Sequence, residues 1–119
     1  MRALFAFLLF ATPALAQPEP PACLFPRRDV ALDAPCLALL AQIARGATGD
    51  LIIRGFAQEQ QGPRVDGLIS RRRAEAVAAE LRRLGVAPER LRVTTQPTEQ
   101  RDLYSRVSSH DRRVEILAD

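Results

Sequence analysis

Lysine and tryptophan are missing from this 119-residue chain, and histidine, methionine and tyrosine each occur once. The single histidine, His110, and two cysteines separated by twelve residues cannot supply the four ligands of a structural zinc site or form a Cys-x-x-Cys redox pair. No Cys/His or Ser/His pair has a plausible catalytic spacing, and no two carboxylates are placed for acid/base work. We therefore expect no catalytic residues, no metal, no cofactor and no enzymatic activity.

The positive charge is carried by arginine alone, with 17 arginines against 14 acidic residues. Arg2 lies in a predicted export signal. Without that signal the mature chain has 16 arginines and 14 acidic residues, which is a net charge of +2. Outside that signal only Phe25, Phe56 and Tyr104 could stack on bases. The small net charge, the few aromatic residues and the predicted export together argue against nucleic acid as a partner.

The first sixteen residues have the pattern of a secretory signal peptide. A positive start at Arg2 precedes an apolar run over residues 3–11, and Ala14-Leu15-Ala16 forms a small-x-small cleavage site. Residues 17–22 are rich in proline and predict an extended tether, which leaves residues 23–119 as one domain. No later stretch approaches the roughly 18 apolar residues that span a bilayer, so we expect no transmembrane segment in the mature chain.

Export favours a disulfide between the two cysteines, because exported proteins meet an oxidising environment. A bond between Cys23 and Cys36 would close a loop of 14 residues and contribute on the order of 3 kcal/mol. Two other states remain open at this point. The cysteines could be buried free thiols, or Cys23 could carry a lipid.

Hydrophobic spacing and breaker residues predict two helices. The first begins after Asp33 as N-cap, has Pro35 in its first turn and runs for about eleven residues to a stop at Gly46. The second covers residues 70–84, with Ser70 as its cap and Gly85 as its stop. Its apolar stripe predicts that Val77 and Leu81 are buried.

Short apolar or alternating runs predict four strands, near Phe25 and at residues 51–53, 91–94 and 114–116. The element order is strand-helix-strand-helix-strand-strand. It predicts an α+β two-layer sandwich, with a mixed parallel and antiparallel sheet of about four strands and two helices on one face. We also expect that strands joined through a helix are parallel neighbours.

Five short motifs occur in an order and spacing that is similar to a known family. They are Leu51-Ile52-Ile53-Arg54-Gly55, Ile69-Ser70-Arg71-Arg72-Arg73-Ala74, Leu84-Gly85-Val86, Glu89-Arg90-Leu91 and Asp111-Arg112-Arg113-Val114-Glu115-Ile116. The chain resembles the OmpA-like C-terminal domain, the peptidoglycan-binding module of outer-membrane and flagellar-stator proteins, over about residues 25–117. The resemblance implies a periplasmic envelope protein, associated with the outer membrane or cell wall, whose partners are peptidoglycan and envelope proteins.

The resemblance also implies a ligand site. In the family, the arginine of Leu-Ser-x-x-Arg and a loop aspartate hold the zwitterionic diaminopimelate of the peptidoglycan stem peptide. The arginine corresponds to Arg73, expected at a solvent-facing position near a helix N-terminus, where an anion would relieve three neighbouring cations. The aspartate corresponds to Gln58, and losing its charge weakens binding roughly 5- to 30-fold. Arg112 and Arg113 are further candidate contacts, or else anchor a loop or pair with an acid such as Glu115.

The ligand pocket is where this sequence departs most from the family pattern. Phe56 and Ala57 replace the His-Thr of the family's loop, and Ser108 stands where the family usually has arginine. The prediction is therefore weakened binding of diaminopimelate-type peptidoglycan. The alternative is an OmpA-like fold that has lost this recognition and acts as a protein-interaction or envelope-assembly module.

Overall fold

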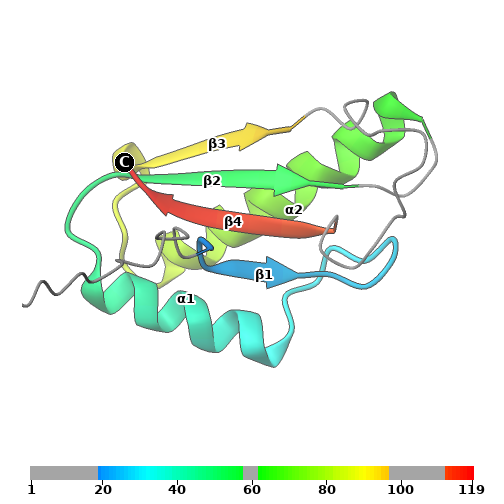
Figure 1. Ribbon diagram of the computed structural model, residues 1–119. Helices are drawn as coiled ribbons and strands as arrows, with labels where there is room; N and C mark the ends of the chain where they lie inside the picture. The colour runs from blue at the N-terminus through cyan, green and yellow to red at the C-terminus, as the bar shows by residue number, and fades with distance from the viewer. Residues whose placement is uncertain (1–18, 58–61, 97–111) are drawn as a thin grey trace, which may run out of the picture.

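Two helices cover one face of a four-stranded mixed sheet (Figure 1). No helix among the described residues covers the other face, which we call the open face. The computed structural model describes residues 19–57, 62–96 and 112–119. Its elements in chain order are β1 (Ala22–Leu24), α1 (Ala34–Gly46), β2 (Leu51–Phe56), α2 (Pro63–Arg83), the 3-10 turn η1 (Pro88–Arg90), β3 (Leu91–Thr95) and β4 (Arg113–Ala118). The predicted fold class, element order and layer arrangement are confirmed. The predicted export signal lies outside the described residues.

The strand order of the sheet is β1-β4-β2-β3. Strands β2 and β3, which α2 connects, are parallel neighbours as expected. Strands β1 and β2, which α1 connects, are not neighbours, because β4 lies between them and is antiparallel to both. The expectation of adjacent parallel strands is therefore wrong for this pair. The last strand takes the central position because Val114 and Ile116 are almost completely buried beneath the helices.

Helix α1 and the disulfide follow the sequence prediction closely. The Asp33 side chain caps the helix by accepting a hydrogen bond from the backbone N–H of Cys36 at 2.9 Å. Cys23 in β1 and Cys36 in the first turn of α1 form a disulfide, so neither is a free thiol and the Cys23 sulfur is not available for lipidation. The sheet reaches into the predicted tether, since Ala22 pairs with Glu115 and the Pro21 carbonyl accepts from the Ile116 N–H.

Helix α2 begins seven residues earlier than the sequence predicts. It starts at Pro63 after Gly62, whose φ of 93° turns the chain into the helix. Ser70 is therefore not a cap, and it lies buried in the middle of the helix with its hydroxyl donating to the Gly67 carbonyl at 2.9 Å. Gly67 and the polar first turn hid this start from the hydrophobic pattern. Arg73 and its two preceding arginines are thus far from the helix N-terminus, and the predicted relief by an anion loses its basis.

The covered face of the sheet packs tightly against α2. Val77 and Leu81 are 0% exposed, which confirms the predicted apolar stripe of this helix. Gly55 on β2 faces the helix, and a Cβ there would overlap the backbone carbonyl of Ser70. Glycine is thus required for this close approach. No helix in the described part of the chain is both long and apolar enough to cross a membrane.

Candidate functional site

The side chain of Arg73 is completely buried between α2 and the segment formed by residues 25–29. Its Nε donates to the Asp29 carbonyl at 2.8 Å, and its Nη2 donates to the Pro26 carbonyl at 3.1 Å. The guanidinium also lies over the Phe25 ring, 5.1 Å from the centroid. The expectation of a solvent-facing Arg73 is therefore wrong. The longer helix turns this residue toward the sheet, where the chain's own carbonyls take its hydrogen bonds.

Arg112 holds the same segment from the other side. The Phe25 N–H donates to the Arg112 carbonyl at 2.9 Å, and the Arg112 Nε donates to the Phe25 carbonyl at 3.3 Å. The structure thus brings two of the predicted site residues, Arg73 and Arg112, to one short segment. We call residues 25–29 the anchored segment. It lies at the end of the sheet where β1 and β2 finish and β4 begins.

The remaining part of the predicted site follows β2. Ala57 is 2% exposed and directly follows the last residue of the strand. Gln58, the predicted partner of the ligand's ammonium group, lies outside the described residues. Its role remains a prediction.

Arg113 lies on the opposite face of the sheet from Arg73. Its Nε donates to Glu115 at 3.0 Å, and its guanidinium lies 3.7 Å from the centroid of the Phe56 ring. Arg54 completes an open-face cluster with Glu115 at 3.7 Å. Because successive side chains of a strand point to opposite faces, Arg113 cannot share the side of the sheet that Val114 and Arg73 occupy. We therefore separate Arg113 from the site, and its alternative role as a partner of Glu115 is confirmed.

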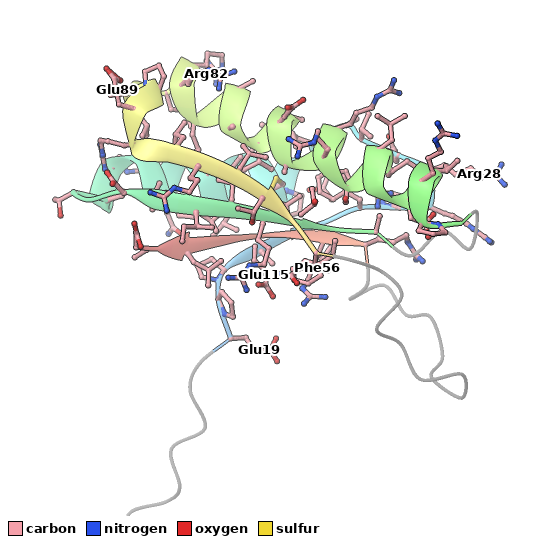
Figure 2. All side chains as sticks on the ribbon, turned by 90° about the horizontal axis from the view of Figure 1, so that it is seen from above. Glu19, Arg28, Phe56, Arg82, Glu89 and Glu115 are labelled. Carbon is pink, nitrogen blue, oxygen red and sulfur yellow. A yellow bond between two sulfur atoms is a disulfide. The ribbon has the colours of Figure 1, made fainter. Side chains whose placement is uncertain are left out.

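A shallow depression of about 550 Å³ borders this open-face cluster. It is lined by Glu19, Pro20, Ala22, Leu24, Arg113 and Glu115. Figure 2 shows Glu19, Phe56 and Glu115 on this side of the sheet, away from Arg28 and Arg82. The depression carries charges of both signs and has no enclosed polar pocket.

Sequence reasoning missed Asp66, which the first turn of α2 places in the interior. It is 3% exposed, and its Oδ1 has no hydrogen-bond partner among the described residues. Asp66 precedes Arg73 by seven residues, or two helical turns, so the two lie on the same side of α2 at a distance of about 10 Å along the axis. The only sequence signal was the spacing of seven residues between Asp66 and Arg73. That spacing places both on one side of a helix only if the helix is known to begin before Asp66.

Arg90 is a second residue that the sequence analysis did not assign. Its guanidinium donates to the carbonyls of Ala47 and Gly49 and so fixes the connection between α1 and β2. This contact lies at the end of the sheet where β2 and β3 begin, away from the anchored segment, and it stabilises the fold. Among the described residues, no group of three His, Cys, Asp or Glu side chains could hold a metal ion.

Comparison with solved structures places this architecture among OmpA-like domains. The peptidoglycan-associated lipoprotein from Burkholderia pseudomallei matches with a TM-score of 0.73 and 20% identity over 82% of this chain and 89% of that chain. The OmpA-like domain of FopA1 from Francisella tularensis matches with a TM-score of 0.68 and 20% identity, over 80% of this chain and 68% of that chain. The C-terminal domain of Helicobacter pylori MotB matches at 0.65 and 20% identity, over 82% of each.

These similarities define the fold of the chain, which is that of the OmpA-like domains. No protein-family model matches the sequence, and a search among curated proteins finds no match.

Proposed function

We propose that this protein is an exported, non-catalytic module of the cell envelope that binds peptidoglycan without forming a covalent bond. Its place is the periplasm, at the outer membrane or cell wall, and its ligand is the diaminopimelate of the stem peptide. The proposal is supported by the fold, which is similar to that of a peptidoglycan-associated lipoprotein. It is also supported by the family motifs that surround Arg73.

The observation that carries the proposal is the pair of buried opposite charges on one side of α2. A zwitterionic ligand needs a cation for its carboxylate and an acid for its ammonium group. Arg73 supplies buried positive charge behind the anchored segment. Asp66 supplies a buried carboxylate whose Oδ1 accepts no hydrogen bond from the described residues. Burial makes both charges effective, because water screens them less than it screens surface groups.

Besides supplying positive charge, Arg73 has a positioning role in this proposal. Two of its nitrogens hold the carbonyls of Pro26 and Asp29, so the residue shapes the rim of the site. Arg112 has the same role through the backbone of Phe25. Arg113 belongs to the open face and is left out of the ligand site.

The experiment is co-sedimentation of the purified protein with isolated sacculi of diaminopimelate-type peptidoglycan. We expect weak binding by the wild type, because Gln58 replaces the charged acid of the family pattern. Gln58→Asp restores that charge and should strengthen binding roughly 5- to 30-fold. The matched control is Gln42→Asp, which makes the same chemical change at an exposed position of α1 and should leave binding unchanged.

Asp66→Asn tests the buried carboxylate in the same assay. If the carboxylate accepts from the ligand's ammonium group, this nearly isosteric variant should bind sacculi several-fold more weakly while its circular dichroism stays unchanged. Equal binding by Asp66→Asn and wild type would remove Asp66 from the site. If the wild type does not sediment and Gln58→Asp does not restore sedimentation, the peptidoglycan proposal fails. The interaction-module alternative then takes its place.

A further inference from the structure

The outward side of α2 carries a row of exposed arginines. They lie in the first, third and last turns of the helix: Arg64, Arg71, Arg72, Arg82 and Arg83. Two acids accompany them, since Arg71 pairs with Glu75 at 3.8 Å and Arg83 pairs with Glu80 at 2.6 Å. The remaining three arginines form no ion pair with any residue that the structure describes. This side of α2 therefore has an excess of three positive charges.

The outward side of α1 carries little charge. The helix contains one charged residue, Arg45, in thirteen positions. Leu37 is 39% exposed, and Ala34, Ala38 and Gln42 also face solvent. Leu37 is therefore an exposed apolar side chain on a weakly charged surface. Among the described residues, the sheet, the disulfide and α2 cover the inner side of α1, and no element covers its outward side.

Both surfaces belong to the helical side of the sheet, because α1 and α2 lie on the same side of it and contact each other (Figure 1). We call their exposed outward residues the helical face. Val65 at 38% and Leu68 at 49% exposure add apolar groups among the arginines of α2. Figure 2 shows Arg28 beside the N-terminal end of α2 and Arg82 near its C-terminal end, both on the helical side of the sheet.

We propose that the helical face docks on the surface of an anionic phospholipid bilayer. Arginine suits lipid phosphates because its planar guanidinium donates two parallel hydrogen bonds. The apolar residues of α1 and the first turns of α2 would enter the boundary between headgroups and acyl chains, as the apolar side of an interfacial helix does. A purely hydrophilic polyanion would leave these apolar side chains in water.

Charge argues against a second copy of the chain as the occupant. Two helical faces placed together would bring their arginine rows close to one another, and the excess positive charge of each would repel the other. An anionic bilayer complements that excess. The proposal does not depend on the peptidoglycan site, since the anchored segment lies at the end of the sheet and the helical face lies along its side.

The test measures co-sedimentation of the exported, processed chain with vesicles of phosphatidylcholine alone or with about a third phosphatidylglycerol. We expect binding to the anionic vesicles only, with loss in high salt. Arg72→Glu with Arg82→Glu should lower the partition coefficient at least 25-fold, because each arginine near an anionic surface contributes about fivefold. Arg92→Glu is the matched charge control, as Arg92 is an exposed arginine on β3 outside the helical face.

A second pair of variants tests the apolar contribution. Leu37→Ser removes an exposed leucine of the helical face, and Leu24→Ser removes a leucine of similar exposure, 44%, on β1. Vesicle binding should fall several-fold for the first and stay at the wild-type value for the second. Circular dichroism and thermal melting establish that each variant is folded.

Each result of these experiments either supports or overturns the proposal. Salt-sensitive binding that only the helical-face variants reduce supports it. No binding to anionic vesicles overturns it, and so does equal loss in the helical-face and control variants. If the arginine variants reduce sedimentation with sacculi but vesicles are not bound, the face recognises the wall and the bilayer is not its partner. If the sacculus experiment contradicts the peptidoglycan proposal, the expected vesicle result is unchanged.

Discussion

Arg73 and Arg113 lie on opposite faces of the sheet, and each guanidinium lies over an aromatic ring, Phe25 for the first and Phe56 for the second. Arg73 is 0% exposed and is held by backbone carbonyls of the anchored segment. The Arg113 side chain is 23% exposed and pairs with a glutamate on its own strand. Similar local chemistry therefore has different roles: the buried guanidinium joins two parts of the fold, and the open-face guanidinium joins neighbours within the sheet.

The difference follows from what covers each face. On the covered face, α2 excludes water, so a charged group must find partners within the chain and its removal leaves those partners unsatisfied. On the open face, water can replace a lost partner at low cost. The following experiments test this contrast. Each of the first two compares a pair of variants with the same substitution, at two glycines and then at two arginines.

Gly55→Ala should produce the largest loss of stability, about 3 kcal/mol, because the new methyl group overlaps the Ser70 carbonyl and forces α2 away from β2. Gly67→Ala is the control. A Cβ at Gly67 meets no atom within 4 Å, and alanine favours the helix, so this change should stabilise the protein by about 0.5–1 kcal/mol. Urea denaturation measures both values. Similar midpoints for the two variants would contradict the tight packing of the covered face.

Arg73→Ala should lower the free energy of unfolding by about 2 kcal/mol, because two backbone carbonyls lose a charged donor in a buried place. Arg113→Ala should lower it by less than about 1 kcal/mol, since its partner Glu115 keeps Arg54 and water. Denaturant unfolding of both variants provides the comparison. An equal cost for the two would mean that burial does not distinguish these arginines.

The smallest effect concerns Arg83, an exposed guanidinium on the outward side of α2. The hydrogen bond from Arg83 lowers the pKa of Glu80 below its usual value, and the coulombic attraction acts in the same direction. A lowered pKa means that this pair's contribution to stability is present above the usual glutamate pKa and is lost as the pH falls through the lowered one. In Arg83→Ala, the pKa of Glu80 measured by NMR titration should rise toward the usual value. An unchanged pKa would contradict the assigned hydrogen bond.

Local features of the sequence were sufficient for several elements. The Asp33 cap, the alternation at residues 114–116 and the apolar stripe through Val77 and Leu81 all appear in the structure as predicted. Each depends on neighbours within a few residues, so the pattern along the chain contains the relevant contacts. The partners of the disulfide were also predictable, because the chain has only two cysteines, although the sequence left open whether they are oxidised.

The start of α2 was not predictable in the same way. Residues 63–69 contain a proline, a glycine and few buried apolar groups, so no hydrophobic period extends through them. Missing these two turns hid Asp66 and led to the wrong environment for Arg73. The candidate site was therefore identified by residue type, while its burial and hydrogen bonds were not.

The apolar stripes of the helices and the cap at Asp33 can be derived from the sequence alone, because they depend on local spacing and on chemistry that one segment can satisfy. The position of β4 between β1 and β2 cannot be derived in this way, since contacts between distant segments set which strands are neighbours in a sheet. The same contacts decided that Arg73 is buried against the anchored segment and that Arg113 lies on the other face. A guanidinium has the same composition in every setting, and what surrounds it in three dimensions sets its role.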